Sequence, residues 1–410
     1  MFAEIGTCRI SDSSSLVSVL DLGGQALTGV FPKTAAELVP VAPLELVWSP
    51  VSGLVQLKHS VDPSEMYGDN YGYRSGLNPT MVEHLKRKTK WLEDSFQPGD
   101  SDLVLDIGSN DGTLLNSYRF KNLVRIGFDP VAKKYLDLYD AGIEVVADFF
   151  SHSALSAISS KKAKIITSIA MFYDLEDPAG FVGEIAESLD GDGVWHFEQS
   201  YLPAMLRTNS YDTICHEHLE YYSLSVIQGL LASQGMKVLD VQTNSVNGGS
   251  FAVTAALDKS PHPVNTPVIE WILRQEENLE LDTSKPYDLF RDRVFQHRDD
   301  LRALVRGLND AGKKVVAYGA STKGNVLLQF CGFGPEDIAC VAEVNAEKFG
   351  SFTPGSGIPI LSEAEVRSMN PDYMLVLPWH FKDFIVTKER KFLEQGGRLI
   401  FPLPEIEIVS

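Results

Sequence analysis

The sequence has few cysteines and no long run of apolar residues. Cys8, Cys215, Cys331 and Cys340 are its only cysteines, and none of them forms a C-x-x-C pair. This scarcity argues against a disulfide framework and favours a reducing compartment. No apolar stretch approaches the roughly 18 residues of a membrane span, and the first residues lack the pattern of a signal peptide. We therefore expect a cytoplasmic protein with no membrane partner.

Basic residues are also scarce. The chain has 36 Lys and Arg against 55 Asp and Glu, a formal net charge of −19, and such a surface repels a phosphate backbone. We expect no nucleic-acid partner. A length of 410 residues predicts two or three domains at about 100–200 residues each, assembled as a monomer or a small homo-oligomer.

Three regions follow one another along the chain. Residues 1–80 carry short strand patterns broken by Gly, Ser and Pro, which predict a small β-rich lobe. Residues 81–258 begin with a helical stretch and then alternate short apolar runs with helices, the pattern of a doubly wound sheet. Residues 259–410 predict a charged helical connector and a second Rossmann-like series. The predicted fold class is therefore α/β.

A glycine-rich turn, G-S-N-D-G at 108–112, joins a predicted buried strand to a helix. Its glycines allow a close backbone approach, and the helix N-terminus offers free N–H groups. Asp129 ends the next strand about 20 residues later, where a carboxylate can hold both hydroxyls of a ribose. The turn predicts an adenosine-containing cofactor. A turn that merely connects strand to helix is the less favoured alternative.

The spacing of this turn favours S-adenosylmethionine over NAD. It reads G-x-x-x-G rather than G-x-G-x-x-G, and Asp106 beside it would repel a pyrophosphate but not a sulfonium. Asp148 follows the third strand, where it would meet the adenine amino group, and Phe149 would stack nearby. The residues assigned to the cofactor are Asp106, Gly108, Ser109, Asn110, Gly112, Asp129, Asp148, Phe149 and Glu198.

The stretch ICHEHLEYYS, residues 214–223, places His216 and His218 on either side of Glu217. Zinc proteases need histidines at i and i+4 of a helix, whereas these are at i and i+2. On a strand the two rings could share a face, so a metal site remains a minor alternative. A histidine has an ordinary pKa of about 6.5 and can serve as a base near neutral pH. A purely structural polar turn, with one histidine in the core, is the other alternative.

Six segments occur here in one order: VLDIGSNDGTLL, FEQSYLPAML, YDTICHEHLEYYSL, NGGSFAV, VVAYGASTKGNVLL and FTPGSGIPI. Together they resemble the sugar C-methyltransferases of deoxysugar pathways over essentially the whole chain. The resemblance implies a zinc-binding lobe, a central S-adenosylmethionine domain and a C-terminal Rossmann-like domain, with the substrate between the last two. It also implies methylation of a ring carbon, usually C3, of a nucleotide-diphosphate 4-keto-deoxysugar through an enolate.

The same resemblance assigns catalytic roles. His218 takes the position of the base that removes the sugar proton, and Glu217 that of its partner. Tyr71 or Tyr73, in YGDNYGYRSG, takes the position of a tyrosine that reaches the sugar from the lobe. His216 is given a supporting role. An enolate needs both a base and a donor to the oxyanion, which these residue types supply.

A second turn, at 319–324, predicts a diphosphate site. Hydroxyls, one lysine and the N–H groups of a helix N-terminus meet there, although the spacing is not that of a P-loop. The resemblance gives this turn the diphosphate of the sugar nucleotide, with PWHF at 378–381 lining the same cleft. A purely structural turn is an equal alternative from the residues alone. The residues assigned to the substrate are Tyr318, Ser321, Thr322, Lys323, Glu343, Asn345 and Lys348.

Two features depart from the family pattern. Cys215 stands where the family usually has a tyrosine, and Tyr211, Tyr221 and Tyr222 are candidates to replace it. The two C-x-x-C pairs of the zinc site are reduced to one cysteine and three serines. Serine hydroxyls are poor Zn²⁺ ligands, so we expect no metal in the lobe. The four positions are Cys8, Ser11, Ser49 and Ser52, and packing through Leu20, Leu22, Leu54 and Leu57 must hold the lobe instead.

Two other functions fit part of this pattern. An epimerase would use the same enolate without needing an intact cofactor turn. A sugar-nucleotide-binding protein without catalysis would explain the lost cysteines and the altered position 215. Binding of S-adenosylmethionine distinguishes both from a methyltransferase.

Overall fold

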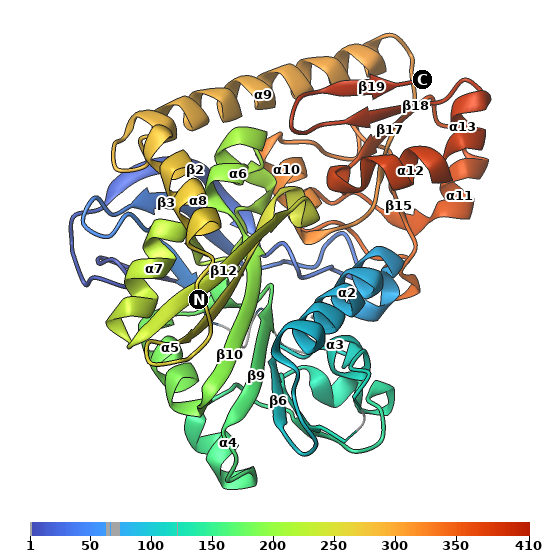
Figure 1. Cartoon of the computed structure of the whole chain (residues 1–410). Coiled ribbons are helices and arrows are strands. Elements are labelled where there is room, and N and C mark those ends of the chain that lie inside the picture. Colours follow the sequence, from blue (N-terminus) through green and yellow to red (C-terminus); the bar gives the residue numbers. More distant parts are fainter. Residues whose placement is uncertain (1, 63–65, 67–73, 121) are drawn as a thin grey trace.

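A computed structural model describes residues 2–62, 66, 74–120 and 122–410. They form a small β lobe and two larger α/β domains (Figure 1), which confirms the predicted fold class. Within these residues, no helix has both the length and the apolar composition needed to cross a bilayer.

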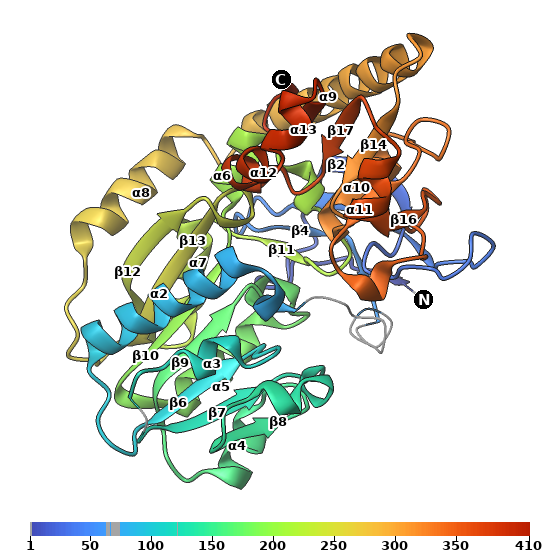
Figure 2. The same cartoon turned by 90° about the vertical axis from the view of Figure 1, so that its right-hand side faces the viewer.

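The N-terminal lobe is a four-stranded sheet of order β11-β4-β3-β2 with a two-stranded ribbon beside it. One of its strands is not local: β11 comes from the middle of the chain, directly after the H-E-H motif, and pairs with β4 in antiparallel register (Figure 2). The sequence did not predict this strand. The lobe strands are β1 (Phe2–Glu4), β2 (Val17–Ala26), β3 (Val41–Trp48), β4 (Val55–Leu57), β5 (His59–Val61) and β11 (Glu220–Tyr221).

All four leucines that were predicted to hold the lobe are buried. Leu20, Leu22 and Leu57 belong to one apolar core that continues into the C-terminal domain. Leu54 packs instead into the core of the central domain. The lobe therefore shares most of its core with the other two domains, and its own separate cluster is small and contains Leu27, Ala42 and Val61.

The central domain has a seven-stranded sheet of order β12-β13-β10-β9-β6-β7-β8, in which β13 runs antiparallel to its neighbours. Chain order reverses between β6 and β9, and ligands bind outside the carboxyl ends of strands at such a point. The strands are β6 (Leu103–Ile107), β7 (Val124–Phe128), β8 (Ile143–Val146), β9 (Ala163–Ile169), β10 (Leu189–Ser200), β12 (Met236–Asn244) and β13 (Ser250–Leu257).

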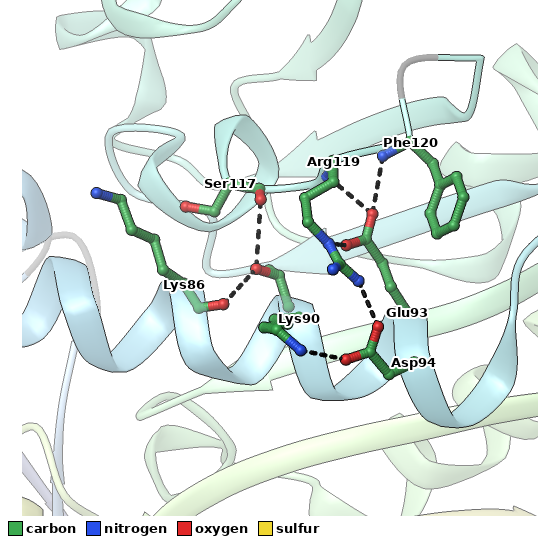
Figure 3. Close-up of polar contacts among 8 residues, drawn as sticks. Lys86, Lys90, Glu93, Asp94, Ser117, Arg119 and Phe120 are labelled. Carbon is green, nitrogen blue, oxygen red and sulfur yellow. Dashed lines mark hydrogen bonds and ion pairs between the residues drawn. The ribbon is translucent and has the colours of Figure 1, made fainter.

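Helix α2 (Pro79–Phe96) enters this domain and is fixed to the loop that follows α3 (Thr113–Asn116) (Figure 3). The buried carboxylate of Glu93 accepts hydrogen bonds from the backbone N–H groups of Arg119 and Phe120, at 2.8 and 2.9 Å. The other helices of the domain are α4 (His152–Ile158), α5 (Pro178–Ser188), α6 (Leu202–Thr208) and α7 (Leu224–Ser233).

The C-terminal domain begins with α8 (Thr266–Asn278) and the long helix α9 (Lys285–Asp310), which runs along the top of the molecule in Figure 1. Its sheet has the order β16-β15-β14-β17-β18-β19 and is parallel except for β19. The sequence predicted the four central strands and missed the two outer ones. The strands are β14 (Val315–Tyr318), β15 (Val341–Glu343), β16 (Ile360–Ser362), β17 (Tyr373–Val376), β18 (Arg398–Phe401) and β19 (Glu407–Val409), and the helices are α10 (Thr322–Phe330), α11 (Glu363–Ser368), α12 (Lys382–Lys388) and α13 (Arg390–Glu394).

Candidate active site

The glycine turn after β6 has the conformation that its sequence requires. Gly108 and Gly112 both have φ near +75°, where a side chain is strained. A Cβ atom at Gly112 would lie 2.7 Å from the ring of Tyr139. That phenol hydroxyl in turn donates to the carbonyl of Asn110 at 2.9 Å and contacts the Ser109 hydroxyl at the same distance. The turn is therefore braced from outside the ligand position.

Asp129 stands beside this turn, as predicted. One carboxylate oxygen accepts a hydrogen bond from the backbone N–H of Asn110 at 2.8 Å, and the other accepts from Val131 at 2.7 Å. Each oxygen can still accept a second hydrogen bond. The geometry is thus compatible with a ribose held at both oxygens, since the backbone has already fixed the carboxylate plane.

Asp106 carries less charge than the sequence argument assumed. It accepts a hydrogen bond from the Thr167 hydroxyl at 2.6 Å, and burial raises the pKa of its carboxyl to about 7. Near neutral pH it is only partly ionised. Repulsion of a pyrophosphate by Asp106 is therefore a weak reason to prefer S-adenosylmethionine, and the spacing of the turn is the stronger one.

Three more cofactor residues have different surroundings. Asp148 and Phe149 follow β8 and are exposed, Phe149 by 58%. Glu198, by contrast, is buried, with one oxygen 2.7 Å from His84 Nε2 and the other 2.8 Å from Lys88 Nζ. Both partners lie on α2. The carboxylate of Glu198 therefore ties α2 to the sheet, which the sequence did not indicate.

The segment that contains Tyr71 and Tyr73 lies outside the described residues. Its continuation is attached to the glycine turn. Arg74 Nε lies 3.2 Å from the carboxylate of Asp111, which also accepts from the N–H of Gly76 at 2.9 Å. The end of the lobe segment thus contacts the predicted cofactor turn directly.

His218 has a fixed tautomer. Its Nδ1 lies 2.8 Å from the carbonyl oxygen of Thr213, an acceptor, so the proton is on Nδ1 and Nε2 keeps a lone pair. The ring meets Tyr173 edge-on at 4.3 Å between centroids. Burial, with the nearby charge of Lys323, lowers the pKa of His218 to about 3. The imidazole is therefore neutral at pH 7 and retains a basic nitrogen.

His216 is placed differently. It is 2% exposed, and its Nε2 lies 3.1 Å from the carbonyl oxygen of Ala42 in the lobe. Burial lowers its pKa to about 4. The two rings thus bond to backbone carbonyls of different domains. In the part of the chain that the structure describes, no group of three or more His, Cys, Asp or Glu residues is arranged to hold a metal.

Glu217 lies where the lobe meets the central domain. The Thr28 hydroxyl lies 3.4 Å from its carboxylate, and the thiol of Cys215 donates to it. Burial raises the pKa of Glu217. The carbonyl of Thr28 also accepts from the side chain of Asn325, on α10, at 2.7 Å. Three domains therefore meet at Thr28.

The three tyrosines that are candidates to replace the family tyrosine at position 215 have different contacts. Tyr221 shares the carbonyl of Thr213 with His218, at 3.3 Å. Tyr211 contacts His297 Nδ1 at 3.1 Å, and Tyr222 stacks on Phe172. Tyr221 is therefore the one that touches the support of His218.

Lys323 brings the C-terminal domain to this motif. It is the second residue of α10, and its positive charge lowers the pKa values of both His218 and His380. Asp212 and Cys215 act on it in the opposite direction and raise its pKa, although burial lowers it more. The ammonium group is therefore within electrostatic reach of both domains.

Sequence reasoning missed the bond that joins these domains beside Lys323. The indole N–H of Trp379, in the 3-10 helix Trp379–Phe381, donates to the carboxylate of Asp212 at 2.8 Å. The same ring packs so closely on Gly248 that a Cβ there would lie 2.9 Å from it. The sequence contained two separate signals, the nearness of Asp212 to the H-E-H motif and the place of Trp379 within PWHF, but nothing that joined them.

The turn after β14 repeats the relationship seen at Asp129. Glu343 accepts from the N–H of Ala320 at 2.8 Å, and Ser321 caps α10 through the N–H of Gly324 at 3.0 Å. Lys348 donates to the carbonyl of Ala320 at 2.8 Å. The turn is therefore held by side chains from three positions around Ala320 and the start of α10.

The other residues assigned to this turn have local partners. Asn345 accepts from the N–H of Glu347 at 3.0 Å. The ring of Tyr318 lies 5.4 Å from Lys388 Nζ, and its hydroxyl bonds to Glu363. Thr322 is the first residue of α10. The structure thus brings Ser321, Thr322 and Lys323 together and gives Tyr318 a different set of neighbours.

Comparison with known proteins shows to which family the chain belongs. Over 99% of its length the chain is 32% identical to the C-methyltransferase NovU of Streptomyces niveus, and the match covers 97% of that protein. The chain belongs to the C-methyltransferase family. Family models match along it as "Putative zinc binding domain" at residues 8–67, "Methyltransferase domain" at 81–241 and "C-methyltransferase C-terminal domain" at 245–404.

The chain is accordingly an S-adenosylmethionine-dependent C-methyltransferase, which excludes the epimerase and the non-catalytic alternatives. Two solved structures each align with less than half of the chain. A methyltransferase from Clostridium acetobutylicum is 13% identical, with a TM-score of 0.34 over 43% of this chain and 92% of that one. Magnesium protoporphyrin IX methyltransferase from Synechocystis is 14% identical, with a TM-score of 0.33 over 46% and 90%. These scores add nothing to the assignment.

Proposed function

We propose that the chain methylates C3 of a nucleotide-diphosphate 4-keto-deoxysugar. One observation carries the proposal: Nε2 of His218 keeps its lone pair where the central domain meets Lys323 of the C-terminal domain. A base and a cation at one junction match a substrate that has an acidic C–H and a diphosphate.

The proposed reaction begins with proton removal. A C–H beside a ketone is acidic because the enolate places its charge on oxygen, and a positioned base accelerates this step by about 10²–10⁴-fold. Nε2 of His218 takes the proton from C3. Glu217, whose pKa burial raises, can carry a proton and donate a hydrogen bond to the sugar. Tyr71 or Tyr73 would supply the second donor from the lobe.

The cofactor is assigned to the first glycine turn. The backbone and side chains of Gly108 to Gly112 would hold its methionine part, and Asp129 its ribose. Asp148 and Phe149 would meet the adenine. S-adenosylmethionine supplies an electrophilic methyl group when bound. Asp106 contributes a partly protonated carboxyl beneath the turn.

The diphosphate is assigned to the second turn. Ser321, Thr322 and Lys323 would contact its oxygens at the N-terminus of α10. Glu343, Asn345 and Lys348 fix the backbone of this turn and of the loop beside it.

Methyl transfer to a panel of sugar nucleotides tests this function. The purified chain is incubated with ¹³C-methyl S-adenosylmethionine and several nucleotide-linked 4-keto-deoxysugars, and NMR locates the labelled methyl group. We expect label on C3 of at least one sugar. Label on oxygen or on another carbon, or transfer to none of the sugars, would contradict the proposal.

A further inference from the structure

The lobe contains the remains of a metal site. Cys8 and Ser11 lie in the loop after β1, and Ser49 and Ser52 lie in the turn between β3 and β4. The two loops still meet, because Cys8 Sγ is 3.1 Å from the hydroxyl of Ser52. The family model for this lobe describes zinc binding, so the donor set decides whether zinc fits.

These four side chains do not fit a structural zinc. Such sites use four thiolate or imidazole ligands, whereas this one offers one thiol and three neutral hydroxyls. The hydroxyl of Ser49 is fully buried and finds no hydrogen-bond partner among the described residues. A hydroxyl left without a partner is what a cysteine-to-serine change produces when no metal remains.

Arg9, between Cys8 and Ser11, joins the first of these loops to strands β4 and β5. Its guanidinium donates to the carbonyl of Leu57 and to the hydroxyl of Ser60, both at 2.7 Å, and its backbone N–H donates to the Gln56 side chain at 2.9 Å. The side chain is 2% exposed. A buried guanidinium with this many bonds joins the first loop to β4 and β5.

Arg9 also reaches the strand that follows His218. Its Nε lies 3.5 Å from the carboxylate of Glu220, which is buried in β11. The residue between, Leu219, donates its N–H to Tyr173 and accepts at its carbonyl from Leu57, both at 2.8 Å. The backbone directly after His218 is thus held by the lobe on one side and by the central domain on the other.

We propose that the lobe folds without zinc, and that Arg9 and Glu220 fix it to the strand behind His218 in place of a metal. Arg9 is a positioning residue, and this part of the proposal rests on the proposed role of His218. The proposal that the lobe folds without zinc does not depend on the role of His218.

Metal content tests the first part directly. The wild-type chain and the variant Ser11→Cys/Ser49→Cys/Ser52→Cys are produced with zinc in the medium, and bound zinc is measured by mass spectrometry. We expect no bound zinc in the wild type and about one ion per chain in the variant, because four thiolates restore a tetrahedral site. One tightly held zinc in the wild type would overturn the proposal. A variant without zinc would show that the two loops no longer form a site.

Substitution of Arg9 tests the second part. Arg9→Met should lower kcat by about 10–100-fold, as expected when a reacting group shifts by about 1 Å, while the Kd for S-adenosylmethionine stays unchanged. Arg9→Lys should recover part of this loss. In Arg9→Met/Glu220→Met neither the guanidinium nor the Glu220 carboxyl is left buried without its partner, so the thermal midpoint should recover while kcat stays low.

Lys58→Met is the matched control, since Lys58 is a partly exposed lobe residue paired with Glu4 and Glu45. Lys58→Met should change neither kcat nor the thermal midpoint. If kcat recovers together with the thermal midpoint in the double variant, Arg9 only stabilises the lobe and the positioning role is wrong. Zinc content and thermal midpoints need no substrate, so they remain decisive even if the sugar assignment fails.

Discussion

Nδ1 of His218 lies 2.8 Å from the backbone carbonyl oxygen of Thr213. A carbonyl can only accept, so this bond places the proton on Nδ1 and leaves Nε2 as the basic nitrogen. Backbone geometry therefore selects the tautomer, and no carboxylate partner is required. His216 bonds through its other nitrogen, Nε2, to the carbonyl of Ala42 in the lobe, so its basic nitrogen is the buried Nδ1.

This difference predicts how the two histidines respond to substitution. His218→Ala should lower kcat by about 10²–10⁴-fold and abolish exchange of the sugar C3 proton with deuterated water. Affinity for S-adenosylmethionine should be unchanged, because the cofactor turn lies elsewhere. His216→Ala is the matched control and should retain exchange. The reverse pattern would exchange the two assignments, and retention in both would leave Glu217 and Tyr71 as candidates.

The buried histidines predict a loss of stability in acid. Burial lowers the pKa of His196 to about 3 and that of His216 to about 4, well below the ordinary 6.5. Between pH 6.5 and these values the unfolded chain binds more protons than the folded one. The contribution of these two neutral histidines to the free energy of unfolding is therefore complete above pH 6.5. It is lost as pH falls, at up to about 1.4 kcal/mol per pH unit for each histidine.

Asp106 affects stability in the opposite direction. Its pKa in the folded chain is raised to about 7, so its contribution to the free energy of unfolding declines as pH rises toward that value. The effect of His196 is measured by comparing the free energies of unfolding of His196→Gln and the wild type in urea at pH 7.5 and 5. The variant should lose less stability between these two pH values. An equal loss in both proteins would show that His196 does not titrate on unfolding.

Asp129→Ala should weaken binding more than chemistry. The carboxylate would contact the cofactor ribose in the ground state and the transition state alike, so the KM for S-adenosylmethionine should rise with kcat at saturation little changed. A lost charge-assisted bond of about 1.5–3 kcal/mol corresponds to roughly 10–100-fold in Kd by calorimetry. An unchanged KM would mean that Asp129 only supports Asn110 and Val131.

Much of the fold could be predicted because strand patterns and glycine turns are local signals. The strand that ends before Gly108 and the one that ends before Gly319 were both recognised from apolar runs of a few residues. Three-residue edge strands such as β16 and β19 were too short to recognise, and β11 depends on a distant partner. β11 has only two residues, Glu220 and Tyr221, and becomes a strand because β4 offers it hydrogen bonds.

The site was predicted less completely, for the same reason. The residues of the glycine turns and the H-E-H motif were found because their spacing is unusual. The bond from Trp379 to Asp212 joins residues 167 positions apart, and nothing local marks either of them. The contacts of Glu198 with Lys88 and His84 could not be predicted, because a carboxylate at the end of a strand gives no sign of partners on a distant helix.

Lys323→Met should separate substrate binding from cofactor binding. Loss of the ammonium group should raise the KM of the sugar nucleotide by about 10–100-fold and weaken inhibition by inorganic pyrophosphate, with the Kd for S-adenosylmethionine unchanged. Lys323 also lowers the pKa of His218, so its removal should move the acid limb of the kcat profile to higher pH. Lys388→Met is the control, because Lys388 pairs with Glu363 instead. Equal effects of the two variants would argue against a diphosphate at α10.

The attachment of α2 predicts a large effect from the loss of one carboxylate. Glu93 is 1% exposed, and its Oε1 accepts the backbone N–H groups of both Arg119 and Phe120 (Figure 3). Glu93→Gln could keep both bonds through its amide oxygen, whereas in Glu93→Met both buried N–H groups lose their acceptor. Unfolding free energy should fall by about 1–3 kcal/mol, measured by urea denaturation.

The neighbouring ion pairs of α2 provide the control. Asp94 contacts Arg119 and Lys90, and all three side chains are about half exposed, so Asp94→Asn should leave stability unchanged within error. Arg119→Ala removes the guanidinium but keeps the backbone N–H, and it should therefore cost less than Glu93→Met. If Arg119→Ala proves as destabilising, the helix is held by the surface charges, and the two buried N–H groups of Arg119 and Phe120 contribute little.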